Sequence, residues 1–520
     1  MTALATTTTL DILARAQSKH GTTRCVGETH IHPRHLTTIL VLAMIRRGRT
    51  EGWLKQPVDA LPTWATFHGV QFNGVKVGPL PGYEDRGSTV VASQALQAGN
   101  VEPLLIVPKE LIISLRSIEL IAKVDHHLHD LLDSLGDFGR TTRGAVLTFL
   151  LFQATICCPD TKDIGVLNPL TEYVKFLPDE LLPTFWTEEE LELLVGTTLK
   201  PAVGAKLNGL LREFEKLRTA TESIPWCAKY WWNEDSGMVT FDDWMRVDAM
   251  YRSRALEFPD VGDCMVPCID MANHASGDAT AALYETDRDG NALLLLRDGK
   301  NIAQGGEITI TYGDDKGACE NIFSYGFVEE TMTTAKVIFL DLDIPDDDPL
   351  RPAKMYVSTA APGFRLFEQN GAIEWESDYV WLVVVNEEDG LDFKIRQTID
   401  GKKEIQSFWK EQELDTVKLR VQLEEDPAWD VFQLRATVLL ENRVDAQIET
   451  LKGSARTKRE ATIRDVPWTL AERLRSLELD MLERALLTLD RQKAKLLDSK
   501  VVIHYLGMDE GAEDEEDDFS

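Results

Sequence analysis

Three short motifs, in a fixed order in the middle of the chain, limit what it can fold into. They are VPCIDMANHAS, GGEITITYG and SYGFV. Asn273 and His274 in the first motif can hold a purine-like cofactor through amide hydrogen bonds. Tyr312 in the second motif and Tyr325 in the third can line a narrow channel that ends in hydroxyl groups. The order of these motifs therefore offers two different chemistries, the binding of a cofactor and the lining of a narrow channel.

In this order and spacing, the motifs resemble the C-terminal half of a SET domain, the fold of protein-lysine methyltransferases that use S-adenosyl-L-methionine. More narrowly, the chain is similar to the Rubisco large-subunit methyltransferase branch of that family. The resemblance implies that Asn273, His274 and Tyr312 contact the cofactor. It also implies that Tyr312 and Tyr325 are the catalytic residues. Asp270 is expected to face the acceptor channel, which Tyr325 would close on the substrate.

A second segment resembles the first cofactor loop of the family, where backbone groups contact the methionine end of the cofactor. It consists of Arg86, Gly87 and Ser88, and a glycine lets the chain come close to a ligand. Two positions depart from the family pattern. The family has a second Gly where Thr89 stands, and it has Ser or Cys where Ala275 follows the histidine.

A third segment, FDDWMRVDAMYRSRAL, predicts a helix that ends in a Ser-Arg pair. By the resemblance, Arg254 pairs with the carboxylate of the cofactor, a task that suits the planar fork of guanidinium donors. Arg252 is a competing assignment. An ordinary role is open for each candidate as well: a surface turn, a solvated helix charge, or a buried tyrosine with a satisfied hydroxyl.

The remaining patterns predict an α+β fold, with a SET-domain β core, a long helical insert and a mainly helical C-terminal domain. The predicted units are an N-terminal helical extension (1–60), a SET domain (61–332) with a helical insert (about 115–245), a helical substrate-binding domain (333–505) and a disordered acidic tail (506–520). Short β-rich pieces fill residues 64–114, and AKVIFLDL predicts one strand after the SET domain. EITITY predicts a strand that ends at Tyr312. The first helix is expected to stop at Gly48.

Charge limits the partners. The chain has 520 residues and a formal net charge of −31. Eight acidic and no basic residues lie in 508–520, so the body of the chain is acidic as well. This acidity would repel a phosphate backbone, which argues against direct nucleic-acid binding, and would attract a basic protein. Acidity that only keeps the protein soluble remains an alternative.

Membrane insertion and export are disfavoured by the N-terminal sequence. The apolar run at 39–45 is far shorter than the roughly 20 residues of a membrane span. The first residues lack the charged start and apolar block of a secretory signal. The seven Cys show no framework spacing, which favours a reducing compartment. We therefore expect a monomer in the cytoplasm or nucleus, without membrane contact.

Cysteine-rich zinc clusters, common in histone-directed SET enzymes, do not flank the motifs, so a non-histone substrate is favoured. Cys264 and Cys268 are too isolated for a metal site and are expected to be buried thiols. The first hypothesis is a protein-lysine N-methyltransferase acting on a basic protein, such as a ribosomal protein or an elongation factor. A histidine acceptor is the second. The third is a catalytically silent SET-like scaffold that binds proteins, which the two departures support and the two retained tyrosines oppose.

Overall fold

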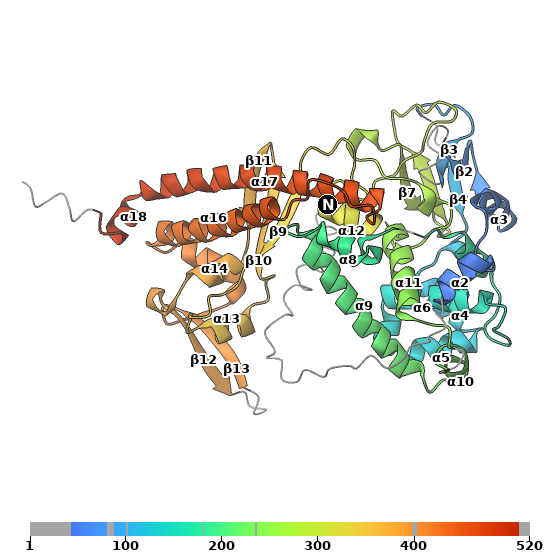
Figure 1. The fold of residues 1–520 in the computed structure, drawn as a ribbon, viewed down its shortest axis with the longest axis horizontal. Helices are drawn as coiled ribbons and strands as arrows, with labels where there is room; N and C mark the ends of the chain where they lie inside the picture. The colour runs from blue at the N-terminus through green and yellow to red at the C-terminus, as the bar shows by residue number, and fades with distance from the viewer. Residues whose placement is uncertain are drawn as a thin grey trace, which may run out of the picture.

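The computed structural model describes residues 43–80, 88–99, 102–179, 181–234, 237–397 and 403–508. The predictions for residues 1–42, for Arg86 and Gly87, and for residues 509–520 of the tail lie outside these ranges. Figure 1 shows two parts, with helix α9 (Leu199–Thr221) running obliquely along the boundary between them. None of the helices in the described ranges combines the length and the apolar character that a membrane span requires.

The first part is built on small antiparallel sheets. Its strands are β1 (Gln71–Phe72), β2 (Val75–Pro79), β3 (Ser88–Ala92), β4 (Leu105–Val107), β5 (Leu256–Phe258), β6 (Gly262–Cys264), β7 (Ala282–Thr286) and β8 (Ala292–Leu296). One sheet has the order β1-β4-β8-β7, and β2-β3 and β5-β6 form two hairpins. Leu105 on β4 pairs with Leu294 on β8. The strands predicted in residues 64–114 therefore form, and they join a second set of strands that follows the helical insert.

Helices fill the insert between these two sets of strands, as predicted. They are α4 (Leu115–Ala122), α5 (His126–Ser134), α6 (Thr142–Cys157), α7 (Pro169–Tyr173), α8 (Glu188–Glu192), α9, α10 (Pro225–Tyr230) and α11 (Phe241–Arg254). Helix α6 begins after Thr141, whose hydroxyl accepts the Gly144 N–H, and its middle is buried all round. A helix that is apolar on every side has to lie inside a core. It packs against α11, which ends at Arg254.

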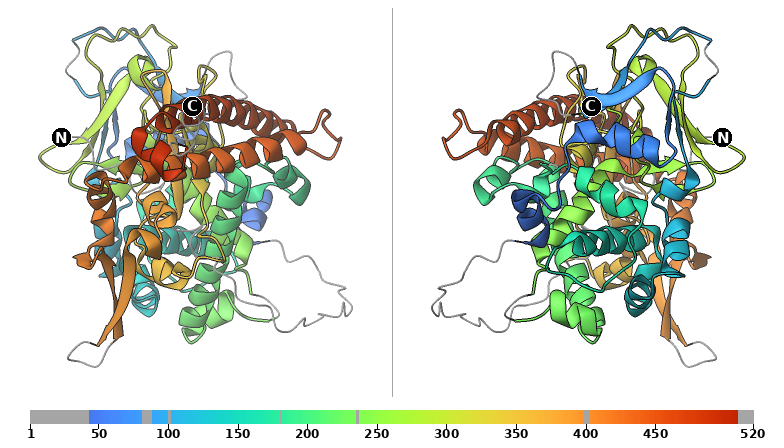
Figure 2. Two further views of the ribbon diagram at one scale, coloured as in Figure 1. Left: turned by 90° about the vertical axis from the view of Figure 1, so that its left-hand side faces the viewer. Right: turned by 90° about the vertical axis from the view of Figure 1, so that its right-hand side faces the viewer.

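The C-terminal part combines long helices with two three-stranded sheets. Its elements are α12 (Ala318–Tyr325), β9 (Val337–Asp341), α13 (Arg351–Val357), β10 (Gly363–Gln369), β11 (Ala372–Glu376), α14 (Tyr379–Val384), β12 (Leu391–Gln397), β13 (Lys403–Trp409), β14 (Gln412–Leu414), α15 (Leu419–Glu424), α16 (Trp429–Gly453), α17 (Asp465–Leu497) and α18 (Lys500–Tyr505). Helices α16 and α17 lie side by side, and β12 and β13 project from the body (Figures 1 and 2). The sequence predicted only β9 among these strands.

Two large hydrophobic cores, beside a small cluster between α16 and α18, divide the described residues differently from their linear order. The second core contains the C-terminal helices, but it also takes in Trp186 and Leu194 of the insert. Helix α12 belongs to it through Ile322 and Phe323. Tyr312, by contrast, packs against the first core. Helix α12, which ends at Tyr325, is therefore anchored in a different core from the one that Tyr312 packs against.

The first described helix, α2 (Met44–Glu51), continues past Gly48, so the predicted stop at that residue is wrong. A Cβ at Gly48 would lie 2.7 Å from Cβ of Leu54, so the glycine lets the segment after the helix pack closely against it. The helix ends at Gly52, whose φ of 85° is the left-handed conformation that glycine adopts easily.

Candidate active site

The centre of the site is a segment that bonds to two different neighbours in turn. The Ile308 N–H donates to the Val90 carbonyl on β3, and the Ile310 N–H donates to the Asn273 carbonyl, 2.8 and 2.9 Å apart. His274 and Ile310 form an isolated parallel bridge. The predicted strand ending at Tyr312 is therefore wrong as a regular strand. The segment is extended, but its partner changes within a few residues, so no continuous ladder forms.

This crossing brings the predicted tyrosines together. The ring centroids of Tyr312 and Tyr325 are 4.5 Å apart, and that of Tyr312 is 5.2 Å from the His274 ring. Tyr325 is the last residue of α12, and Gly326 follows it in the left-handed conformation. The turn brings Phe327 back, so that its ring lies 6.2 Å from that of Tyr325. Four aromatic rings from three separate motifs thus form one cluster.

Both nitrogen atoms of the His274 ring are engaged inside the protein. Nδ1 accepts the Tyr312 N–H at 2.9 Å, and Nε2 lies 3.1 Å from the Glu329 carboxylate. That carboxylate also accepts the Ser276 hydroxyl at 2.6 Å. Burial lowers the pKa of His274, although Glu329 partly opposes the shift. A neutral ring with its proton on Nε2 fits both bonds, so the imidazole fixes the backbone of Tyr312.

The side chain of Asn273 bonds to a residue outside the aromatic cluster. Its Nδ2 donates to Oε1 of Glu307 at 2.7 Å, while its carbonyl accepts the Ile310 N–H. Of the first cofactor loop the structure describes Ser88, the first residue of β3, paired with Pro79. The motif residues are therefore neighbours in the fold, although only His274 adds its ring to those of the tyrosines.

The two tyrosine hydroxyls have opposite hydrogen-bond roles. Tyr312 donates its proton to the Ala272 carbonyl at 2.8 Å, which leaves its oxygen lone pairs as acceptors. The Tyr325 hydroxyl accepts from Nζ of Lys316 at 2.8 Å, and Lys316 also pairs with Glu320 at 3.2 Å. Sequence reasoning missed Lys316. The available signal was its place between the two tyrosines, four residues before a glutamate.

Asp270 is buried behind the cluster, in a 3-10 turn. Tyr173 donates its hydroxyl to Oδ2 of Asp270, and no partner in the described part of the chain reaches Oδ1. Arg254 donates to the Asp270 carbonyl at 3.0 Å and lies 3.8 Å from Oδ2. Burial raises the pKa of Asp270 to about 6, against the opposing effects of Arg254 and Tyr173.

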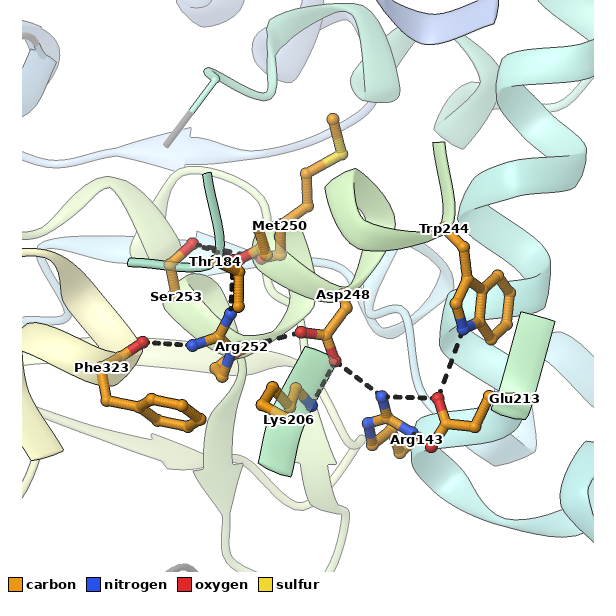
Figure 3. A network of polar contacts seen from close by, with 11 residues as sticks. Arg143, Thr184, Lys206, Glu213, Trp244, Asp248, Met250, Arg252, Ser253 and Phe323 are labelled. Atoms are coloured by element: carbon orange, nitrogen blue, oxygen red, sulfur yellow. Dashed lines mark hydrogen bonds and ion pairs between the residues drawn. The ribbon is translucent and has the colours of Figure 1, made fainter. Parts of the chain in front are cut away.

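Arg252, the competitor of Arg254, belongs to a buried charge network (Figure 3). Asp248 is fully buried and contacts Arg143 at 2.6 Å, Lys206 at 2.7 Å and Arg252 at 3.2 Å. Arg252 also donates to the Phe323 carbonyl on α12. The guanidinium of Arg252 therefore uses its hydrogen bonds to hold α11 against α12. Arg254, in contrast, lies beside Asp270.

Cys264 and Cys268 are both buried thiols, as predicted, and burial raises the pKa of each. Within the described ranges, no group of three or more His, Cys, Asp or Glu side chains could hold a metal ion.

Solved structures share the fold of this chain. A structure of Rubisco LSMT bound to AdoMet matches with a TM-score of 0.60 at 18% identity, covering 89% of this chain and 98% of that chain. The SET domain of LSMT bound to MeLysine and AdoHcy also matches with a TM-score of 0.60 at 18% identity, covering 87% of this chain and 97% of the other. The predicted α+β SET-domain architecture, with its helical C-terminal region, is confirmed.

Sequence similarity identifies the family. SET domain-containing protein 8 of Schizosaccharomyces pombe is 30% identical over 349 residues, which are 65% of this chain and 75% of the relative. No protein-family model matches the chain. The chain belongs to the SET domain-containing proteins, as its motifs predicted.

Proposed function

We propose that this protein is an S-adenosyl-L-methionine-dependent protein-lysine N-methyltransferase. The observation that carries the proposal is the pair of tyrosines, whose rings lie 4.5 Å apart although they come from separate motifs. In a SET-domain protein this pair occupies the positions that the motifs predict for catalysis. The solved Rubisco LSMT structures contain AdoMet, or AdoHcy with methyllysine, which supports the same chemistry for this chain.

The residues present fit a cofactor with a carboxylate and a sulfonium cation. Arg254 offers a guanidinium for the carboxylate. The electron-rich faces of Tyr312 and its neighbouring rings suit a sulfonium. Backbone groups of residues 273–275 and Ser88 would complete the pocket. When bound, S-adenosylmethionine supplies a methyl group activated for direct transfer to a nitrogen nucleophile.

The chain's own residues would orient the acceptor and keep it reactive. The Tyr312 oxygen, with its proton committed to Ala272, can accept C–H or N–H hydrogens near the transfer point. The ammonium of Lys316 beside Tyr325 disfavours a second positive charge, so it favours the neutral, nucleophilic form of an incoming lysine. Oδ1 of Asp270, which has no hydrogen-bond partner among the described residues, would be a further hydrogen-bond acceptor in the pocket.

The proposed substrate is a basic, non-histone protein, because the net charge of −31 would attract one. We propose that the enzyme acts as a monomer in the cytoplasm or nucleus.

The experiment that tests the proposed function is methylation of a lysate from the source organism with isotopically labelled cofactor, followed by mass spectrometry of the labelled site. A labelled lysine supports the proposal. A labelled histidine would show that the acceptor is histidine and not lysine. The absence of any label would argue for a catalytically silent scaffold.

Tyr312→Phe tests the role of the hydroxyl. Loss of a transition-state hydrogen bond is expected to lower kcat by about 100-fold, while cofactor binding stays within twofold. Tyr356→Phe, at an exposed site on α13, is the matched control. An unchanged rate in Tyr312→Phe would refute the assigned role.

A further inference from the structure

The carboxylate of Glu329 binds two residues of the segment that is expected to hold the cofactor. Glu329 lies four residues after Tyr325, just outside the predicted SYGFV motif. Its Oε1 atom lies 3.1 Å from Nε2 of His274, and its Oε2 atom accepts the Ser276 hydroxyl at 2.6 Å. The side chain of His274 is 1% exposed and that of Glu329 is 14% exposed. Hydrogen bonds to a charged group that is shielded from solvent in this way are strong ones.

The His274 ring replaces a backbone acceptor where the backbone pairing stops. The Ile310 N–H donates to the Asn273 carbonyl at 2.9 Å, and the Ala275 N–H donates to the Ile310 carbonyl at 3.0 Å. In a continuous parallel pair the next acceptor would be the Ala275 carbonyl, but this carbonyl accepts a threonine hydroxyl at 2.6 Å. The Tyr312 N–H donates instead to Nδ1 of His274 at 2.9 Å. The orientation of the imidazole therefore sets the backbone position of Tyr312.

This bond to Tyr312 depends on the protonation of the imidazole. Nδ1 accepts an N–H only while it carries no proton itself, so the neutral ring has its proton on Nε2. A buried N–H needs an acceptor, and Glu329 supplies one. Burial lowers the pKa of His274 and Lys336 lowers it further, while Glu329 and Asp314 oppose them. Glu329 therefore favours the tautomer that holds Tyr312.

The turn that carries Glu329 also follows directly on the second tyrosine. Tyr325 ends α12, and Gly326 reverses the chain with a φ of 76°. Further along, the Met332 N–H donates to the Glu329 carbonyl at 3.1 Å, and the Met332 carbonyl accepts from Arg473 on α17. Met332 is buried in the second core. The backbone of Glu329 is thus anchored in the C-terminal part, while its carboxylate reaches the cofactor segment.

We infer that Glu329 is a positioning residue for methyl transfer, which acts through His274 on Tyr312 and through its own turn on Tyr325. This inference rests on the proposed function. One carboxylate ties together the segment expected to bind the cofactor and the two tyrosines expected to orient the acceptor. Misplacement of reacting groups by about 1 Å can lower a rate on the order of 100-fold, so a residue with no direct contact to the substrate can still control the rate.

Two substitutions of Glu329 in the full-length chain test the inference. The initial rate of methyl transfer into the lysate is measured at saturating labelled S-adenosylmethionine, and calorimetry gives the affinity for S-adenosylhomocysteine. We expect Glu329→Ala to lower the rate about tenfold or more, and the affinity to stay within about threefold, because the backbone bonds of Ile310 still hold the cofactor segment. Glu329→Gln keeps an acceptor for the Nε2 proton and should keep most of the rate. Glu119→Ala, at an exposed site on α4, should change neither value.

Nuclear magnetic resonance of isotopically labelled histidine reports the state of the His274 ring directly, with His274→Leu to identify its signals. We expect a neutral ring with its proton on Nε2 in the wild type and in Glu329→Gln at neutral pH. In Glu329→Ala the proton should move partly or wholly to Nδ1. A variant that is only destabilised would keep the wild-type tautomer in its folded molecules, so this signal separates positioning from folding.

A wild-type tautomer or a wild-type rate in Glu329→Ala would overturn the inference and leave the proposed function intact. The Glu329→Gln variant decides even if Glu329→Ala does not fold. Its His274 pKa should fall further below the wild-type value, because the opposing charge is gone, and an unchanged pKa would overturn the inference. A wild-type chain that neither binds S-adenosylhomocysteine nor labels the lysate would overturn the proposed function itself.

Discussion

Lys316 donates a hydrogen bond from Nζ to the hydroxyl oxygen of Tyr325 over 2.8 Å, and the same ammonium lies 5.0 Å from the centroid of the tyrosine ring. Burial lowers the pKa of Lys316, but Tyr325 and Glu320 outweigh burial and raise it. Lys316 is therefore a fixed cation at neutral pH and cannot act as a general base there. It orients the hydroxyl and sets the charge of the acceptor pocket.

Replacing this cation should lower the rate of methyl transfer. In Lys316→Met the Tyr325 hydroxyl loses a charged donor, a bond of about 1.5–3 kcal/mol, so we expect kcat to fall about tenfold or more. The KM for the cofactor should stay within about twofold, and Lys316→Arg should keep more activity than Met. Lys200→Met, which removes an exposed pair with Glu192, is the control. A normal kcat in Lys316→Met would refute the orienting role.

The buried network around Asp248 should be a large contribution to stability. Asp248→Asn removes the carboxylate that Arg143, Lys206 and Arg252 share, and only Arg143 keeps another carboxylate partner among the described residues, Glu213. Breaking a buried charge cluster in this way costs about 3–5 kcal/mol of unfolding free energy, measurable by urea denaturation. Lys206→Met added to that variant should restore part of the loss, since it removes one unmatched charge. Asp160→Asn, at a 60% exposed side chain, should cost less than about 1 kcal/mol. Equal losses in the two single variants would contradict this account.

The motif residues could be found from the sequence because the fold brings them together over short chain distances. Tyr312 and Tyr325 are joined by a loop and the short helix α12, and His274 meets the segment before Tyr312 through a single bridge to Ile310. The residue types alone then indicate the chemistry. The hydrogen-bond partners of these side chains were harder to predict from the sequence. The His274 ring bonds to Glu329, a partner 55 residues away, and this depends on the turn after Gly326.

Residues that act through distant partners left no local signal. Asp243 caps α2 although the two segments are about 200 residues apart in the chain. Asp248 likewise collects cations from three helices. The strands β10 to β14 were missed for a related reason. A segment such as LDFKIRQ in β12 is mostly exposed, so its alternation of apolar and charged residues is weak without the neighbouring strand.

A buried glutamate should make stability depend on pH near neutrality. Glu478 on α17 accepts the N–H and hydroxyl of Thr198, with Arg475 and Cys319 as its charged or titratable neighbours. Burial raises its pKa from 4.5 to about 7, so the folded state holds a proton that the unfolded state has lost between these values. The stabilising contribution is complete below pH 4.5 and disappears as the pH rises through 7.

Glu478→Gln removes this titration. The difference in unfolding free energy between the wild type and Glu478→Gln should shift by about 2–3 kcal/mol between pH 5 and pH 8, with the wild type losing stability as the pH rises. Glu472→Gln, at an exposed position on the same helix, should follow the wild type at every pH. Parallel curves for Glu478→Gln and the wild type would show that the carboxyl group does not titrate in this range.

Gly196 joins the insert to the C-terminal helices at a point where no side chain fits. Its φ is +83°, and a Cβ there would lie 2.9 Å from the backbone nitrogen of Leu451 on α16. Gln447 on the same helix donates to the Gly196 carbonyl at 2.5 Å, so the backbone cannot move away freely. Gly196→Ala should therefore cost about 2–4 kcal/mol, from the left-handed conformation and the collision together. Gly204→Ala in α9 has nothing within 4 Å of the new Cβ and should raise stability by about 0.5–1 kcal/mol. Thermal unfolding of both variants gives the comparison, and a Gly196→Ala protein as stable as the wild type would mean that the insert and α16 separate without cost.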